Sequence, residues 1–128
     1  SVIPSNWETR MRVDKTNLQN CFERISLISS SSIEKEKKYP VKVSVDVGKV
    51  VISCTNQTGD AKEELYVTTE GQNLEAGFNP KYFLDALRSI DDEEIFVDFG
   101  TSISPCIIRP VDESGDYIYM VLPIRLKE

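Results

Sequence analysis

The segment VKVSVDVGKVVISCT, which runs from Val41 to Thr55, indicates the class of fold most directly. Valines alternate with polar residues in its first half, and a period of two is typical of a strand with one buried face. Gly48 interrupts this alternation, and a second run rich in β-branched residues follows it. A glycine between two such runs is typical of a tight turn. The stretch therefore predicts a β-hairpin that turns at Gly48.

An amphipathic helix is predicted before this hairpin. Its apolar residues recur at the three- and four-residue intervals of one helix face, at Leu18, Cys21, Phe22, Ile25 and Ile28. Thr16 and Gln19 have the spacing of a capping box, so we expect the helix to begin there. Leu27 falls almost opposite the apolar face, on the side of Arg24. One exposed leucine is ordinary, but Leu27 and Ile28 together can form a small contact patch at the helix end.

A second helix is predicted over residues 78–90, FNPKYFLDALRSI. Asn79 is a favoured N-cap residue and Pro80 suits the first helical turn. Phe78 can pack against Phe83 as a hydrophobic staple. Further strands are expected at residues 8–14, 61–70, 73–78, 94–100, 104–110 and 116–128.

The two halves of the sequence resemble each other. Each contains a strand, a capped helix, a polar loop, a strand, a tight turn and another strand, and VSVDVG at 43–48 is echoed by IFVDFG at 95–100. A repeat of about 50 residues indicates an internal duplication whose two units share one core. Because each helix has one apolar face to cover, we expect an α+β domain with both helices on one side of antiparallel sheets.

Composition limits the classes of function. The chain has 128 residues, the size of one domain, and its net charge of −6 argues against a uniformly basic surface for nucleic acid, although a local basic stripe is compatible with it. Cys21, Cys54 and Cys106 lie in apolar stretches with no close pair, which indicates a reducing, cytoplasmic setting. No stretch approaches the roughly 18 apolar residues of a membrane span and no leader opens the chain, so we expect no membrane partner.

Candidate catalytic or metal-binding residues are sparse. The sequence contains no histidine, the commonest general base and metal ligand. The four acids Asp91–Glu94 suggest either a metal cluster or a solvated turn, and the turn is favoured because adjacent carboxylates in a loop point apart and repel. DESGD at 112–116 begins like a calcium loop, but Tyr117 and Pro123 stand where glycine and glutamate are required. We therefore predict no catalytic residues, no metal site and no cofactor, and a hairpin turn at 112–116.

The C-terminal stretch DYIYMVLPIRLKE, from Asp116 to Glu128, is unusually apolar for an acidic chain. Pro123 removes a ladder donor and is expected to help end the strand. The even positions form one aliphatic face, part of which we expect to lie in the core, at Ile118, Met120, Leu122, Ile124 and Leu126.

Four stretches together resemble a known family: VIPSNWETRMRVDKTNLQNCFERISLIS at 2–29, AGFNPKYFLDALRSI at 76–90, SPCIIRP at 104–110 and YIYMVLPIRL at 117–126. In order and spacing they resemble the C-terminal domain of the bacterial DNA polymerase III β subunit, the replicative sliding clamp. GFNPKYFLDAL and YMVLPIRL are the most specific of these motifs. The resemblance implies the DNA-clamp fold and the third of three similar domains, each built from a duplicated unit. In that family two chains close head to tail into a ring around duplex DNA, as a processivity factor without catalytic residues of its own.

The resemblance implies a peptide-binding pocket for the polymerase III α subunit, the clamp loader and repair proteins, whose motif contains a glutamine and a Leu-Phe-like pair. The matching positions are Val2, Asn79, Tyr82, Ile103, Pro105, Met120, Leu122, Pro123, Ile124 and Arg125. Leu122 and Ile124 stand where the family often has methionine, whose side chain adapts more readily to varied ligands.

The resemblance also implies two further surfaces. A DNA channel lined by the helices would include Asn20, Arg24, Lys81 and Arg88, with loose phosphate contacts that permit sliding. A ring-closing interface would include Leu27 and Ile28. The alternative interpretation of the chain is a stand-alone α+β interaction domain that binds another peptide or small ligand, unrelated to replication.

Overall fold

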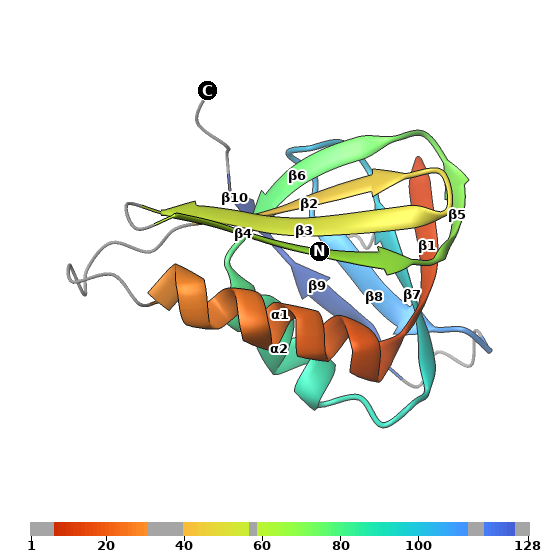
Figure 1. The fold of residues 1–128 in the computed structure, drawn as a ribbon. Helices are drawn as coiled ribbons and strands as arrows, with labels where there is room; N and C mark the ends of the chain where they lie inside the picture. Colours follow the sequence, from red (N-terminus) through yellow and green to blue (C-terminus); the bar gives the residue numbers. More distant parts are fainter. Residues whose placement is uncertain (1–6, 31–39, 57–58, 113–116, 125–128) are drawn as a thin grey trace.

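The computed structural model describes residues 7–30, 40–56, 59–112 and 117–124 (Figure 1). Along this part of the chain the helices are α1 (Lys15–Ser30) and α2 (Pro80–Arg88). The strands are β1 (Thr9–Asp14), β2 (Val41–Asp46), β3 (Lys49–Asn56), β4 (Gly59–Tyr66), β5 (Thr68–Gly71), β6 (Leu74–Phe78), β7 (Glu94–Phe99), β8 (Cys106–Pro110), β9 (Tyr119–Val121) and β10 (Pro123–Ile124).

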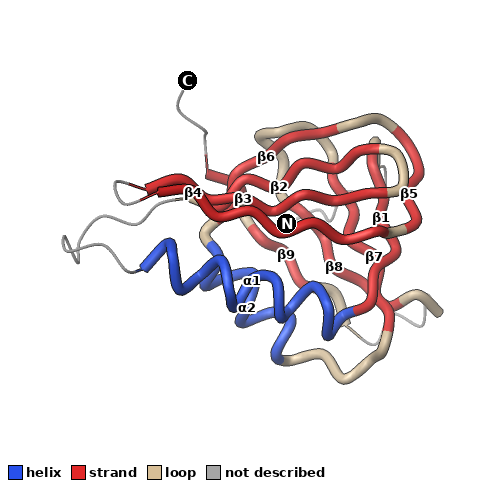
Figure 2. Tube along the Cα trace, in the orientation of Figure 1, coloured by secondary structure: helices blue, strands red, loops and turns tan. Residues whose placement is uncertain are grey.

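These strands form two antiparallel sheets: sheet A has the order β5-β1-β7-β8-β9, and sheet B has the order β10-β6-β2-β3-β4. The two helices lie next to each other along one side of the sheets (Figures 1 and 2). They meet through Phe22 and Phe83, whose stacked rings are 4.5 Å apart between centroids. The expected α+β arrangement, with both helices on one side of antiparallel sheets, is confirmed.

The strand orders reveal the internal duplication. Exchanging each strand of the first unit, β1–β5, with the strand numbered five higher in the second unit, β6–β10, converts the order of sheet A into that of sheet B. Each unit is a strand, a helix and four more strands, and its last two strands belong to different sheets. The chain crosses between sheets at Val67, between β4 and β5, and again at Leu122, between β9 and β10.

The register of the duplication differs from the one that the sequence suggested. Val13 and Phe78 directly precede the two helix N-caps, and they pair with Ile95 and Val41 respectively. Val41 is therefore equivalent to Ile95, whereas the echo of VSVDVG and IFVDFG aligned Val43 with Ile95. A shift of two residues leaves every side chain on the same face of its strand, so the alternation of apolar residues could not reveal it.

The helix starts are set by two different caps. Asn79 caps α2 as predicted, with its Oδ1 accepting a hydrogen bond of 2.9 Å from the backbone N–H of Lys81. The predicted start of the first helix at Thr16 was wrong, because α1 begins at Lys15 and the Oδ1 of Asp14 accepts from the Asn17 N–H at 2.9 Å. Asp14 ends β1, so its extended backbone leaves its carboxylate free to reach the third helical residue.

The apolar faces of the helices and the inner faces of both sheets form one core. The predicted hairpin turns at Gly48, whose φ of +73° is a left-handed conformation that glycine adopts readily. The predicted staple is confirmed, since the rings of Phe78 and Phe83 meet edge to face at 5.2 Å. Leu27 is 70% exposed, as its place opposite the apolar face predicted.

No helix among the described residues is long and apolar enough to cross a membrane.

The C-terminal strands differ from the expectation of one aliphatic face partly in the core. Val121 is the core residue, at 2% exposed, whereas Met120 is 44% and Leu122 66% exposed. The cause is register: Val121 pairs with the core residue Cys106, which places Met120 on the opposite face of sheet A. Pro123 opens β10 instead of ending a strand, because β9 already stops at Val121.

Candidate functional site

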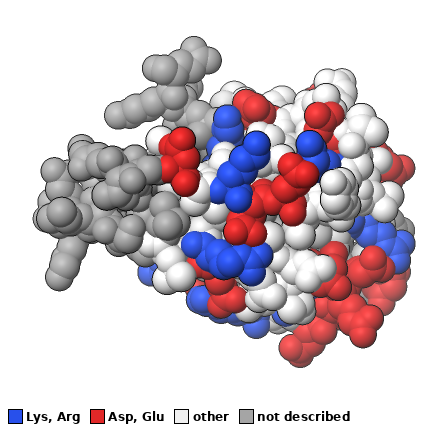
Figure 3. Space-filling view, viewed as in Figure 1, with Lys and Arg blue, Asp and Glu red and all other residues white. Residues whose placement is uncertain are grey.

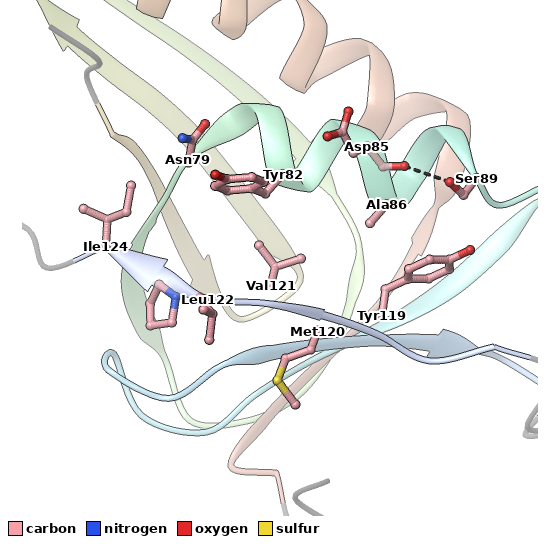
Figure 4. A pocket seen from close by; sticks show the side chains of 11 residues that line it. Asn79, Tyr82, Asp85, Ala86, Ser89, Tyr119, Met120, Val121, Leu122 and Ile124 are labelled. Atoms are coloured by element: carbon pink, nitrogen blue, oxygen red, sulfur yellow. Dashed lines mark hydrogen bonds between the residues drawn. The ribbon is translucent and has the colours of Figure 1, made fainter. Parts of the chain in front are cut away.

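A pocket of about 560 Å³ lies between α2 and the C-terminal strands β9 and β10 (Figure 4). Its volume falls within the usual range of sites for small ligands and peptide side chains. The residues that line it are Asn79, Tyr82, Asp85, Ala86, Ser89, Tyr119, Met120, Val121, Leu122, Pro123 and Ile124.

The helical wall of the pocket is formed by residues at helical intervals. Tyr82, Ala86 and Ser89 follow one another at four and three residues, so they share one face of α2. Ala86 and Ser89 are small, and the Ser89 hydroxyl donates back to the Asp85 carbonyl at 3.0 Å. The small side chains on this face of the helix leave open space between α2 and the strands. Tyr82, which is 60% exposed, borders this space.

The strand wall carries exposed apolar side chains. Val121 projects toward α2, whereas Met120 and Leu122 point to the other side of the strand and border the pocket from there (Figure 4). Ile124 lies beyond Pro123, where the chain has joined sheet B. Adjacent apolar side chains left in water are typical of a surface that binds a partner.

The structure brings together most of the residues that the resemblance implied. Asn79, Tyr82, Met120, Leu122, Pro123 and Ile124 line the pocket. Val2 and Arg125 lie outside the described residues. Ile103 and Pro105 are not among the lining residues, because both lie in the connection between β7 and β8; Ile103 is 69% exposed, and Pro105 lines a second cavity.

The sequence analysis missed several lining residues, namely Asp85, Ala86, Ser89, Tyr119 and Val121. Helical spacing from Tyr82 was a signal for Ala86 and Ser89, since both fall on its side of the helix. Tyr119 and Val121 had no comparable signal, because the pairing of β9 with β8 decides which face of that strand meets α2.

The residues implied for a DNA channel are exposed on the helices, and two of them form ion pairs. Arg24 lies 2.8 Å from Glu63 on β4, and Arg88 lies 3.2 Å from Glu23 on the neighbouring helix. The hydrogen bond from Arg24 lowers the pKa of Glu63. Basic and acidic groups consequently alternate over the face that carries α1 (Figure 3). The other two implied residues, Asn20 and Lys81, are exposed, and the side chain of Ile28 lies outside the described residues.

The candidate reactive groups are engaged in ordinary structural contacts. Burial raises the pKa of the Cys21 and Cys106 thiols, which disfavours the nucleophilic thiolate. Residues Asp91–Glu94 are exposed, and within them Asp92 accepts a hydrogen bond of 2.7 Å from the Tyr117 hydroxyl. Burial, followed by this bond, raises the pKa of Tyr117. Of the segment 112–116, only Asp112 belongs to the described residues, and it follows β8 in an antiparallel connection to β9.

Comparison with known proteins places these features in a family. Residues 1–125 match the family model described as DNA polymerase III beta subunit, C-terminal domain. The chain is 31% identical over 126 residues to the beta sliding clamp of Staphylococcus epidermidis, which is 97% of this chain and 32% of that protein. The chain thus spans about a third of the length of the curated relatives it matches.

Solved structures show the same likeness in three dimensions. The β subunit of DNA polymerase III from Thermotoga maritima is 35% identical, with a TM-score of 0.89 over 98% of this chain and 33% of that one. The corresponding subunit from Pseudomonas aeruginosa is 29% identical, with a TM-score of 0.86 over 97% of this chain and 32% of that one. The chain therefore belongs to the family of the DNA polymerase III β subunit, as its C-terminal domain.

Proposed function

We propose that residues 1–128 act as the third domain of a replicative sliding clamp, an accessory processivity factor of the cytoplasmic replication machinery. In this proposal the pocket between α2 and β9–β10 docks short peptides of the polymerase III α subunit, the clamp loader and other clamp-binding proteins. One observation carries the proposal: exposed apolar residues at the positions implied by the resemblance, including Tyr82, Met120 and Leu122, border a single pocket of about 560 Å³.

The chemistry of the pocket suits a peptide with a polar residue and two apolar anchors. Each buried apolar side chain of the peptide contributes roughly 1.5–3 kcal/mol, against the entropic cost of ordering the peptide. Asn79 uses its Oδ1 to cap α2, so its Nδ2 group is the part that can donate to a peptide carbonyl. Ile124 and Pro123 extend the apolar wall beyond the crossing point between the sheets.

Chemical-shift mapping with the labelled 128-residue chain tests this function. The probe is a synthetic peptide containing a glutamine and a C-terminal Leu-Phe pair. We expect resonances of Tyr82, Ala86 and residues 119–124 to move, with a dissociation constant no tighter than about 10 μM for so small an interface. Movement confined to the β4 end near Asp60, or no movement at millimolar peptide, would contradict the docking site.

We propose that DNA is held by enclosure in the ring and only weakly by this chain itself. Arg24 and Arg88 already pair with acids, and the net charge is −6. Binding of the isolated chain to linear duplex should therefore be weak and sensitive to salt. Submicromolar affinity at physiological salt, measured by fluorescence anisotropy, would contradict this expectation.

We also propose that Leu27 and Ile28 contribute to head-to-tail closure with a second chain. Leu27 is 70% exposed at the end of α1, so it is available to a partner without any change in the core. Replacing both residues with alanine in a full-length clamp should shift the ring toward monomers, because about 3 kcal/mol of apolar burial is lost. Sedimentation that shows an intact ring at low concentration would contradict this role.

A further inference from the structure

A charged cluster lies on the outer face of sheet A, the face turned away from the core. Asp98 on β7 is 2% exposed and accepts from Arg10 on β1 through two bonds, of 2.7 Å from Nε and 3.0 Å from Nη2. The guanidinium of Arg10 lies 4.8 Å from the Trp7 ring centroid and 4.1 Å from that of Phe96. Arg10 is thus held rigidly, and its fork already engages both oxygens of Asp98.

Arg109 on β8 also approaches the Asp98 carboxylate, but its hydrogen-bonding groups are less well paired than those of Arg10. Its Nε lies 3.0 Å from Oδ2 of Asp98, yet its buried N–H is not aimed at that oxygen and makes no hydrogen bond. One carboxylate therefore faces two guanidinium groups, of which Arg10 has the better geometry. A buried donor without an acceptor is unfavourable. Two guanidinium groups and one carboxylate together carry a net positive charge, which favours an arriving anion.

Arg109 borders a cavity of about 130 Å³ that could receive such a group. Trp7 and Pro105 supply apolar surface to this cavity, and Ser104 supplies a hydroxyl. By liquid volume the space equals about four water molecules, which is the scale of one carboxylate-bearing side chain. Asp98 also borders the cavity, so a singly charged carboxylate is favoured over a phosphate dianion, which Asp98 would repel more strongly.

The cavity lies beside the peptide pocket, across two neighbouring strands. Asp98 pairs with Ile107, and Ile107 pairs with Met120, so the three residues form one row across β7, β8 and β9. Figure 4 shows the Met120 side chain on the side of β9 away from α2, the same outer face. Two strand spacings separate Asp98 from Met120 by roughly 10 Å, the length of about three residues of extended peptide.

We propose that this cavity receives an acidic side chain of the peptide docked against Met120 and Leu122, with Arg109 as the residue that binds its carboxylate. The inference rests on the proposed docking function and adds a charge preference to it. The acidic residue lies about three positions from the residue that contacts Met120, because that spacing spans the row from Met120 to Asp98.

The test compares matched peptides by isothermal titration with the 128-residue chain at low salt. Each twelve-residue peptide contains a glutamine and a Leu-Phe pair, and carries either Glu or Gln three positions before or three positions after that pair. At one of these positions the Glu peptide should bind about fivefold more tightly than its Gln partner, as expected for a partly exposed charge-assisted hydrogen bond. In Arg109→Gln the ratio should fall to about one, with the affinity for the Gln peptide unchanged.

Arg12→Gln is the matched control, because Arg12 and Arg109 both lie beside Phe96 on the same face, and Arg12 pairs with Glu94 at 2.6 Å. This variant should retain the fivefold ratio, and thermal melts should show that both variants are folded. Equal binding of the Glu and Gln peptides at both positions overturns the inference but leaves the docking function intact. A ratio that persists in Arg109→Gln also overturns it. If neither peptide binds the wild-type chain, the docking function fails, and this inference fails with it.

Discussion

In the first unit of the duplication, Arg24 on α1 reaches Glu63 on β4 at 2.8 Å, with the sulfur of Cys21 3.6 Å from the same arginine. In the second unit, the position ten residues after the N-cap is Ser89 instead of Arg24, and Ala86 replaces Cys21. The ladder pairings make Tyr119 on β9 the equivalent of Glu63. One helix–strand junction is thus bridged by an ion pair, while the other holds the pocket.

The pocket therefore arises from side-chain size and charge on a backbone plan that both units share. The crossing points at Val67 and Leu122 follow the same plan to within one residue, since Arg12 pairs with Thr68 and its equivalent Gly77 pairs with Ile124. The edge strand of the first unit carries acids at Glu63 and Glu64. The edge strand of the second unit carries aromatic and aliphatic residues, which leave an apolar surface where a partner can dock.

The largest expected effect compares how much equivalent residues on the outer faces of the two units contribute to the free energy of unfolding. The equivalent of Asp98 in the first unit is Ser44, which is only half-buried. Asp98→Asn should lower the free energy of unfolding by about 3 kcal/mol, because two partly buried guanidinium groups lose their counter-charge. Ser44→Ala should cost less than about 0.5 kcal/mol. Urea denaturation measures both, and similar values for the two variants would show that the network around Asp98 is not stabilising.

The second prediction concerns a variant that introduces the ion pair of the first unit into the pocket of the second. The double variant Ser89→Arg, Tyr119→Glu places the ion pair of the first unit across the pocket. We expect a loss of peptide affinity of more than tenfold, because the new side chains occupy the space and add charge to an apolar site. Circular dichroism should confirm the fold. Peptide binding at wild-type strength would mean that the pocket is not formed by side-chain size at these positions.

The third prediction trims the apolar wall of the pocket. Met120→Ala should weaken peptide binding by roughly 1–1.5 kcal/mol, about tenfold, through lost apolar contact. Its stability should change little, because Met120 is already 44% exposed. The matched control is Glu64→Ala at the equivalent position of β4, which should leave peptide affinity unchanged. Titration of labelled chains measures both, and equal losses in the two variants would contradict a site at β9.

The smallest effect concerns the ion pair of the first unit and its dependence on pH. Arg24 lowers the pKa of Glu63, so the ionised form contributes stability that is present above the unfolded pKa and is lost as pH falls through the folded one. Arg24→Gln should therefore melt slightly below the wild type at neutral pH and converge with it in the acidic range. Thermal melts between about pH 3 and pH 7 measure the difference, given the usual glutamate pKa near 4.3. A constant difference at every pH would exclude this linkage.

Much of the local structure could be predicted from the sequence because it depends on near neighbours. The hairpin at Gly48, the cap at Asn79, the contact of Phe78 with Phe83 and the exposure of Leu27 all follow from spacing along the chain. The start of α1 was missed for a local reason as well. Asp14 both ends β1 and caps α1. Because Thr16 is also a favoured N-cap residue, the sequence analysis placed the helix start there and overlooked Asp14.

The site was predicted in part for the same reason. Motifs place Asn79 and Tyr82 on one helix and Met120 and Leu122 on one strand, but spacing within each element cannot show how the two elements meet. Pro105 is an example of what spacing cannot show. It lies two residues before Ile107, the strand partner of Met120, yet it lines the second cavity together with Trp7. Its position depends on how the connection after β7 folds over the outer face of sheet A.

Sequence patterns alone show which residues alternate and where helices are capped, since these properties depend on residues within about one turn or one hairpin of each other. The repeated unit is visible for a different reason, because two segments about 50 residues apart carry similar patterns. The tertiary structure selects the inner face of β9. A period of two is the same for both faces, and the pairing of Val121 with Cys106 distinguishes them. The tertiary structure also decided the two-residue register of the duplication and the crossing at Leu122, which opens the pocket between segments distant in sequence.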